Sequence, residues 1–250
     1  MSDFGRGTAR SIPQTVDMSI DAGLRAFMLG VYNKMALGLL LSAGIAYAVA
    51  TVPAIRDLLY VVSPTGAFRG FTMGGMVLAF APLALVLISG FAMRNPSPAG
   101  SAALYWGIVS LIGASGAVWV LRYTGGSIAS TFLITATAFG ALSLVGYTTK
   151  KDLTGFGSFL IMGVWGLIIA SVVNMFLAAP MLYWMINAAG VLIFAGLTAY
   201  DTQRLKMTYY AIGGDQTGLA VATNYGALSL YLDFINLFQF LLAFMGGRRS

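Results

Sequence analysis

Cysteine, histidine and glutamate are all absent from this chain of 250 residues. Without cysteine there is no disulfide bond or thiolate, and without histidine there is no imidazole metal ligand or Ser-His-Asp triad. All acidic side chains are aspartates, of which there are eight. These absences exclude most familiar enzymatic and metal-binding sites. We therefore expect a protein that is not an enzyme and that holds no resident cofactor.

Charge is also scarce, because charged residues make up 9% of the chain and hydrophobic residues 58%. A soluble domain carries about 25% charged residues. Water could not solvate a surface of this composition, so the chain is predicted to be an integral membrane protein. The net charge of +6 does not indicate nucleic-acid binding. The basic residues lie between hydrophobic segments, where they orient a membrane protein.

Seven apolar segments approach the length of about 20 residues that a helix needs to cross a bilayer. They cover residues 29–50, 71–93, 102–121, 127–147, 156–178, 182–203 and 219–245. The two longest links between them are residues 51–70 and 204–218. We expect an all-α protein with seven transmembrane helices in a single domain, residues 26–250. A mobile cytoplasmic tail, residues 1–25, precedes this domain.

The lysine and arginine residues predict the orientation. With seven spans, nine of them lie on the side of the N-terminus and five on the other side. Because basic residues favour the cytoplasmic side, the N-terminus and the 204–218 link are expected in the cytoplasm. Arg248 and Arg249 then lie outside, against the trend. A re-entrant seventh segment would return them to the cytoplasmic side.

The last apolar segment carries a carboxylate, Asp233, in the stretch LSLYLDFINLFQFLLAF (228–244). An aspartate at the centre of a membrane helix costs roughly 2.5–3.5 kcal/mol. At 3.6 residues per turn, it belongs to a polar stripe that covers about a third of the circumference. The stripe consists of Tyr225, Ser229, Asp233, Asn236 and Gln239. It is expected to face the bundle interior or a water-filled path, although a hydrogen-bonded seam between helices would look the same.

A second acid, Asp201, ends the sixth segment. Arg204 lies three residues further on, so a local ion pair on one helix is one interpretation. An acid near a helix C-terminus is disfavoured by the helix dipole, which favours a partner elsewhere in the fold. Arg94, at the inner end of the second segment, is a candidate cation for this role. The first acid, Asp233, is the other candidate partner.

Two aspartates that meet inside a bundle titrate as a unit and share one proton over part of the pH range. With the proton, Asp201 and Asp233 would form a latch between two helices. Without it, they would repel each other and attract a cation. Carboxylate and amide oxygens suit a hard ion such as Ca²⁺, and weak binding suits a conduction path. Asp201 and Asp233 are therefore the predicted gating and ion-binding residues, with Ca²⁺ as the permeant ion and protons as the regulator.

Four stretches resemble the Bax inhibitor-1 family, the last of them its bacterial members: LYLDFINLF (230–238), AYDTQRLK (199–206), KKDL (150–153) and VYNKMALGLLL (31–41). The resemblance covers the chain from about residue 25 to its end. It implies a multi-pass protein of the bacterial inner membrane, with seven helices of which the last is central and wrapped by the other six. The 204–218 link appears longer than in compact members of the family.

The resemblance also implies a function. Members are linked to a pH-sensitive calcium leak that a pair of aspartates gates, and these correspond here to Asp201 and Asp233. The family has an arginine at the end of the second helix that can pair with the acid corresponding to Asp201, and Arg94 fits this position. Here a single arginine stands where the family has a basic cluster, which weakens the assignment of Arg94.

Two other functions compete with the leak channel. A bacterial member of the family modulates a membrane-bound ATP-dependent protease, so a regulator without ion transport is one alternative. An intramembrane aspartyl protease is the other, because Tyr200 and Asp201 form the YD pair of that class. Such proteases also need GxGD and PAL motifs. No glycine precedes Asp233 in this way and no PAL tripeptide occurs, so the enzyme is disfavoured.

Overall fold

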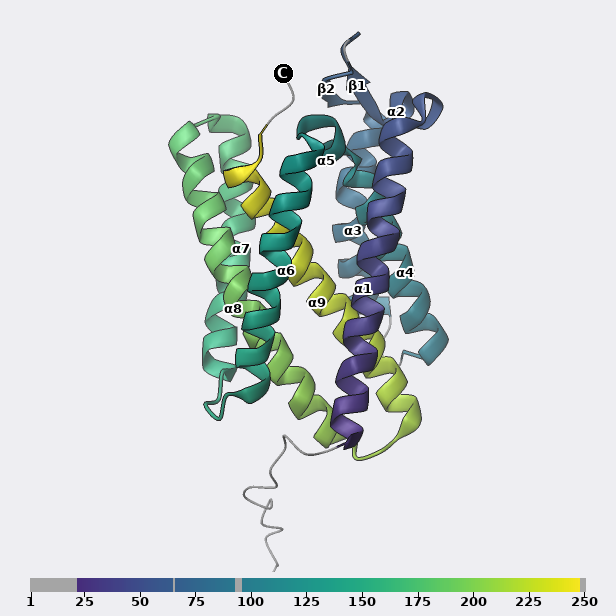
Figure 1. The fold of residues 1–250 in the computed structure, drawn as a ribbon, viewed down its shortest axis with the longest axis vertical. Helices are drawn as coiled ribbons and strands as arrows, with labels where there is room; N and C mark the ends of the chain where they lie inside the picture. The colour runs from purple at the N-terminus through teal and green to yellow at the C-terminus, as the bar shows by residue number, and fades with distance from the viewer. Residues whose placement is uncertain (1–21, 65, 93–95, 248–250) are drawn as a thin grey trace, which may run out of the picture.

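The computed structural model describes residues 22–64, 66–92 and 96–247 (Figure 1). The helices are α1 (Ala22–Thr51), α2 (Pro53–Leu59), α3 (Met73–Ala92), α4 (Pro98–Ser115), α5 (Ala117–Arg122), α6 (Gly125–Thr148), α7 (Thr154–Leu177), α8 (Pro180–Ile212) and α9 (Gln216–Met245). Strands β1 (Tyr60–Val62) and β2 (Phe68–Phe71) form an antiparallel hairpin between α2 and α3. Arg94, Arg248, Arg249 and residues 1–21 of the predicted tail lie outside the described residues. Residues 22–25 of that tail belong to α1.

Six helical spans in the described residues are long and apolar enough to cross a membrane: α1, α4 continued by α5, α6, α7, α8 and α9. They confirm the prediction of an all-α membrane protein. The predicted segment 71–93 corresponds to α3, whose apolar stretch, Met73–Ile88, is shorter than the other six. Pro82 lies inside this helix. A count of seven full spans is therefore not reached within the described residues.

The connection between α8 and α9 differs from the expected link of residues 204–218. Helix α8 continues to Ile212, because residues 204–212 contain no glycine or proline that would end the helix before Gly213. Gly213 and Gly214 have φ angles of 63° and 94°, a conformation that glycine adopts readily. The Asp215 side chain then caps α9 by accepting hydrogen bonds from the backbone N–H groups of Thr217 (3.1 Å) and Gly218 (2.9 Å). The prediction of a long loop was wrong.

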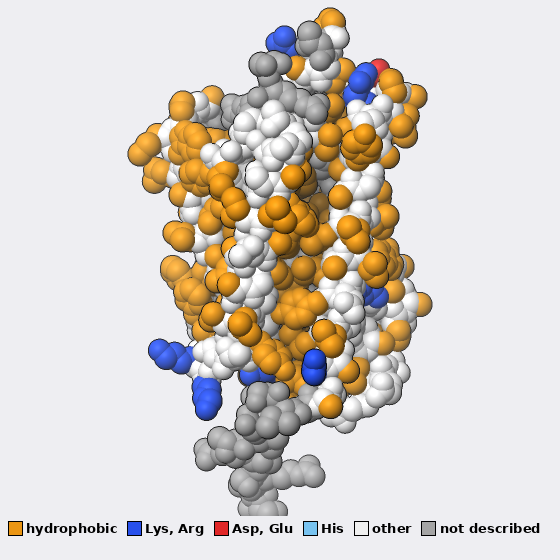
Figure 2. Space-filling model, viewed as in Figure 1, with side chains coloured by type: hydrophobic (Ala, Val, Ile, Leu, Met, Phe, Trp, Pro, Cys, Tyr) orange, Lys and Arg blue, Asp and Glu red, His pale blue; other side chains and the backbone are white. Residues whose placement is uncertain are grey.

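Helix α9 runs diagonally through the centre of the bundle (Figure 1). Its main neighbours are α1, α4, α6 and α8, whereas α7 packs chiefly on α8, and α3 on α4. Buried apolar side chains of α1, α4 and α9 form the largest core cluster. The last helix is thus central, as expected, although α3 and α7 form an outer layer. Hydrophobic side chains cover the flank of the molecule, and lysine and arginine residues gather toward its two ends (Figure 2).

Glycine permits the close approach of α6 and α8. A Cβ atom at Gly146 would lie 2.1 Å from the carbonyl oxygen of Ala199, whereas one at Gly140, on the same helix, would meet nothing within 4 Å. We expect Gly146→Ala to lower the free energy of unfolding by about 1–3 kcal/mol through overpacking. Gly140→Ala is the matched control, and it should leave stability unchanged or raise it because alanine favours a helix. Thermal unfolding in detergent tests this, and equal stabilities would contradict it.

Candidate functional site

The two membrane aspartates meet between the central helices. Asp201 in α8 is 5% exposed and Asp233 in α9 is 4% exposed. Their carboxyl groups lie close enough to interact with each other. A hydrogen bond between them would require a proton on one of the two groups, because an ionised carboxylate only accepts. The structure therefore brings together the two acids that the sequence analysis selected.

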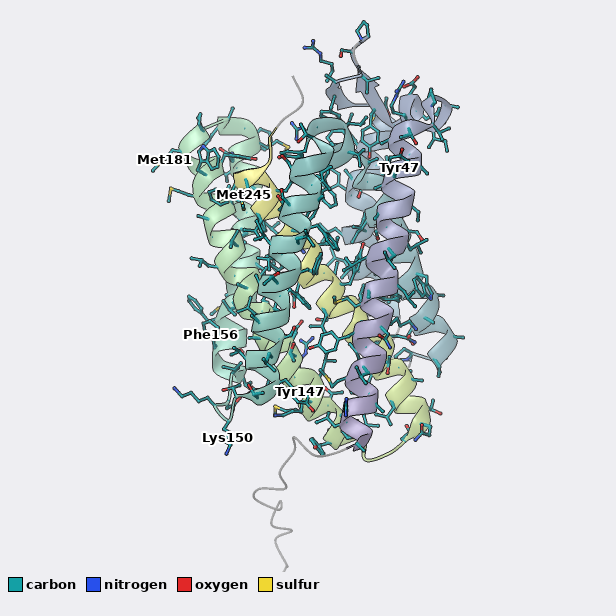
Figure 3. All side chains as sticks on the ribbon, viewed as in Figure 1. Tyr47, Tyr147, Lys150, Phe156, Met181 and Met245 are labelled. Atoms are coloured by element: carbon teal, nitrogen blue, oxygen red, sulfur yellow. The ribbon has the colours of Figure 1, made fainter. Side chains whose placement is uncertain are left out.

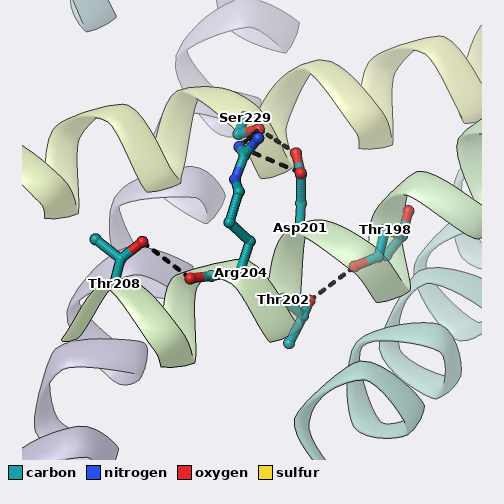
Figure 4. Close-up of polar contacts among 6 residues, drawn as sticks. All are labelled: Thr198, Asp201, Thr202, Arg204, Thr208 and Ser229. Carbon is teal, nitrogen blue, oxygen red and sulfur yellow. Dashed lines mark hydrogen bonds and ion pairs between the residues drawn. The ribbon is translucent and has the colours of Figure 1, made fainter. Parts of the chain in front are cut away.

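Arg204 and Ser229 complete the polar contacts of Asp201 (Figure 4). The Nη2 atom of Arg204 lies 3.2 Å from Oδ1 of Asp201 and donates to Oγ of Ser229 at 3.0 Å. The Ser229 hydroxyl donates in turn to Oδ2 of Asp201. Asp201 thus has both the ion pair with Arg204 on its own helix and a hydrogen bond to Ser229 on α9. Arg204 is the cation that the described residues place beside Asp201.

Asp233 is less well compensated. Its Oδ2 atom is buried and has no hydrogen-bond partner among the described residues. A buried carboxyl oxygen without a partner costs free energy that a proton, a cation or a water molecule would reduce. The positive charge at this site therefore comes from Arg204 of α8 and lies beside Asp201. Arg94, the cation that the sequence analysis favoured, lies outside the described residues.

The polar stripe of α9 is only partly engaged with the pair. Ser229 and Asp233 belong to the site, whereas the side-chain nitrogen of Asn236 donates to the Leu232 carbonyl oxygen of its own helix at 2.8 Å. Tyr225 and Gln239 are half-buried on the same helix. The stripe therefore contains two residues of the site and three that lie outside it, of which Asn236 forms its hydrogen bond within α9.

A second polar cluster, which the sequence analysis did not identify, ties α9 to α1 and α4. The buried Asn224 donates to the Pro98 carbonyl oxygen (3.1 Å) and to Oγ of Ser101 (2.8 Å), and it accepts from Lys34. About two turns of helix beyond it, the Tyr231 hydroxyl contacts Oγ of Ser42 at 2.6 Å. Asn224 stands next to the predicted stripe, so its polarity was the available signal. These bonds hold the N-terminal half of α9 against α1 and α4.

The other side of α8 is fixed to the loop between α6 and α7. Gln203 accepts a hydrogen bond from the Leu153 N–H (2.8 Å) and donates to the Lys151 carbonyl oxygen (2.7 Å). Lys206 donates to the Tyr147 carbonyl oxygen at 2.8 Å, close to the end of α6. Hydrogen bonds from Thr154 hold the pKa of Asp152 below its usual value. The loop lies at the end of the bundle marked by Lys150 and Tyr147 (Figure 3).

Gln203 is 7% exposed, and the backbone of the α6–α7 loop satisfies both ends of its amide. We expect Gln203→Leu to lower the free energy of unfolding by about 1–3 kcal/mol, because two backbone groups lose their partners. Gln216→Leu is the matched control, since Gln216 is exposed and makes one long bond of 3.4 Å to Gly214. Thermal unfolding of both variants in detergent is the measurement. A Gln203→Leu variant as stable as its control would contradict the conclusion that the Gln203 amide stabilises the packing of the α6–α7 loop on α8.

The site offers few ligands for a tightly held metal ion. Among residues 22–64, 66–92 and 96–247, no group of three or more acidic, histidine or cysteine side chains comes together. Two carboxyl groups and a hydroxyl remain, whereas Ca²⁺ takes six to eight oxygen ligands. Fold and site together define a multi-pass α-helical membrane protein whose central helices are joined by a buried pair of aspartates.

Comparison with known proteins gives the family. The family model described as "Inhibitor of apoptosis-promoting Bax1" matches residues 24–250. The chain is 68% identical to an uncharacterized protein of Caulobacter vibrioides over the full length of both chains. It is 43% identical to the inner membrane protein YbhL of Escherichia coli, with 91% of this chain and 94% of the relative covered. The chain belongs to the Bax inhibitor-1 family, as the four sequence stretches predicted.

Proposed function

We propose that this protein is a pH-sensitive leak channel for calcium in the bacterial inner membrane, gated by Asp201 and Asp233. The observation that carries the proposal is the contact of these two buried carboxyl groups between α8 and α9. Intramembrane acids are costly, and they mark ion or proton pathways in membrane proteins. Membership of the family and the name of the Escherichia coli relative, an inner membrane protein, support the location.

The proposed gate works through the shared proton. While one proton is shared, the hydrogen bond between the carboxyl groups holds the cytoplasmic halves of α8 and α9 together. When that proton leaves, two negative charges face each other in a site of low dielectric constant and repel. The separated carboxylates then attract a cation. Flux is therefore expected to rise as the pH rises through the titration of the pair.

Ca²⁺ enters this proposal as a permeant ion, not as a resident cofactor. Two carboxylates with Ser229 provide a thin set of hard oxygen ligands, which suits an ion that must also leave. Arg204 compensates the charge of Asp201 when no ion is present. We propose no enzymatic activity for the site. The alternative function is a regulatory protein that acts on a partner, such as a membrane-bound protease, and transports no ions.

The proposed orientation has the N-terminus in the cytoplasm. Lys150 and Tyr147 mark the end of the bundle where α1 begins and α8 gives way to α9 (Figures 1 and 3). Lys151 follows Lys150 in the same loop, and Lys206 donates to the Tyr147 carbonyl oxygen. Because lysine and arginine favour the cytoplasmic side, this end is assigned to the cytoplasm. Protons of the cytoplasm would then reach the pair by way of Arg204, whose side chain is 45% exposed.

The deciding experiment measures Ca²⁺ entry into liposomes that contain the purified protein, between about pH 6 and pH 8. We expect a leak that grows with pH and that empty liposomes lack. A wild-type protein that gives no flux at any pH would refute the channel and leave the regulator of a membrane protease as the better explanation. A leak that is independent of pH would refute the gate alone.

A further inference from the structure

The segment between α1 and α3 exposes large apolar side chains. Val52, Ile55, Leu58 and Val61 recur every three residues and are 41%, 43%, 71% and 49% exposed. Helix α2, which carries two of them, has no buried residue. Exposed apolar side chains that gather in this way mark a contact surface. Proline, glycine and charged residues led to the prediction of a simple link over residues 51–70, so this surface is a feature of the fold.

The segment is held firmly in place. The Tyr60 hydroxyl lies 2.9 Å and 3.0 Å from the carbonyl oxygens of Ala114 and Ser115 at the end of α4. Burial raises the pKa of Tyr60 to about 12, so this donor stays protonated at neutral pH. The Thr72 hydroxyl donates to the Leu58 carbonyl oxygen at 2.6 Å. The exposed side chains therefore stand on a rigid support, and they do not belong to a loose loop.

The apolar surface continues onto the membrane helices on either side. Helix α2 begins two residues after α1 ends, and Met73 follows Thr72 directly at the start of α3. Met73 is 80% exposed, and Tyr47 in the last turns of α1 is 65% exposed. Figure 1 shows α2 and the hairpin together at the end of the bundle that is opposite to the loop between α8 and α9. The segment thus lies where membrane helices enter and leave the bilayer.

Positive charge accompanies this surface. Arg69 is exposed on β2, and Arg122 lies 4.9 Å from the ring centroid of Phe68. Arg56 pairs with Asp57 at 2.8 Å, and this aspartate is the one acid of the segment. Figure 2 shows basic side chains at this end of the molecule. Apolar side chains beside arginines suit the boundary between acyl chains and headgroups, where anionic phospholipids add electrostatic attraction.

We propose that residues 52–72 form an interfacial lipid-binding element. Ile55 and Leu58 enter the acyl boundary of the adjacent leaflet, while Arg56 and Arg69 contact anionic phospholipid headgroups. The element fixes the depth of the outer ends of α1 and α3 in the membrane. This inference depends on the membrane location of the chain and is independent of ion transport.

Spin labels test the depth of the element directly. The chain has no cysteine, so Leu58→Cys and Asp57→Cys each give one labelling site in an otherwise natural protein. Both side chains are exposed, so neither substitution disturbs the core. In vesicles of phosphatidylcholine and phosphatidylglycerol, the Leu58 label should collide more with oxygen than with a water-soluble nickel chelate, and the Asp57 label should show the opposite preference. Equal, high access of nickel to both labels would overturn the proposal and indicate water or a soluble partner.

The headgroup contact has its own test. Phosphatidylglycerol added to the protein in detergent should raise its Tm more than phosphatidylcholine does. In the double variant Arg56→Gln, Arg69→Gln this difference should fall to roughly half or less, because headgroup attraction scales with the number of basic residues. The double variant Lys150→Gln, Lys151→Gln at the opposite end is the control. An undiminished difference in the arginine variant would overturn the assignment of anionic headgroups to this element.

Discussion

Replacing Asp233 by asparagine is expected to reduce calcium flux into liposomes by at least about tenfold, because the proposed conduction path would lose its buried negative charge. Asparagine has almost the same shape but cannot ionise. The pair then holds at most one charge, on Asp201, and Arg204 already compensates this charge. Repulsion between the two side chains can no longer open the contact between α8 and α9. The flux that remains should be independent of pH.

The fold should survive this change. Asp233 is buried, with one carboxyl oxygen that accepts no hydrogen bond from the described residues, so a neutral amide removes a charge that is hard to solvate. We expect the Tm of Asp233→Asn to equal or exceed that of the wild type. Asp57→Asn, at an exposed acid far from the pair, is the control for flux and should behave as the wild type. Equal flux in Asp233→Asn and wild type would refute the role assigned to Asp233.

The contact between Asp201 and Asp233 could be predicted from the sequence, because both residues lie in regular helices. Helical periodicity placed Asp233 among polar residues on one face, and the count of spans placed Asp201 on a neighbouring helix. Each rule concerns a position along a regular helix, where geometry follows from residue number. That Asp201 and Asp233 lie together is therefore a result of the structure, whereas their role in gating stays a prediction.

Other parts of the site depended on contacts that residue spacing does not encode. The sequence suggested that Arg204 pairs with Asp201 on one helix, but the bridge from Arg204 to Ser229 requires the packing of α8 on α9. Gln203 was unremarkable in the sequence, because its partners are backbone groups of a distant loop. Residue-level patterns identify acids in apolar segments, whereas they do not identify which neutral side chains hold them in place.

The irregular segments were predicted least well. Residues 204–212 were expected in a loop because the link 204–218 carries glycine and charge, yet these residues extend α8 beyond the apolar span until Gly213. Residues 60–70 were also expected in a link without secondary structure, but Tyr60 and Phe71 pair in the β1–β2 hairpin. In both cases charged residues together with glycine or proline were taken as the end of a helix or as the absence of structure. Local propensity and tertiary contact decided the outcome.

Replacing Arg204 by glutamine is expected to move the pH dependence of flux toward higher pH. The guanidinium favours the ionised form of its neighbour, Asp201, which lies 3.2 Å away. Without this cation, the state that shares a proton persists to higher pH, and so does the closed contact between α8 and α9. Arg204 is 45% exposed, so solvent and salt reduce its effect. We therefore expect a shift of about one pH unit or less, largest at low ionic strength.

Variants at two arginines distinguish Arg204 from Arg94 as the cation that serves the pair. Arg204→Lys keeps the positive charge but loses the planar group that contacts both Asp201 and Ser229, so it should give a shift smaller than that of Arg204→Gln. Arg94→Ala should leave the curve unchanged if Arg204 is the partner. A curve that moves with Arg94→Ala and stays fixed with Arg204→Gln would assign the role to Arg94 instead. Because all variants are compared by the midpoint of the same flux curve, a loss of protein in the liposomes would alter its height and leave this comparison intact.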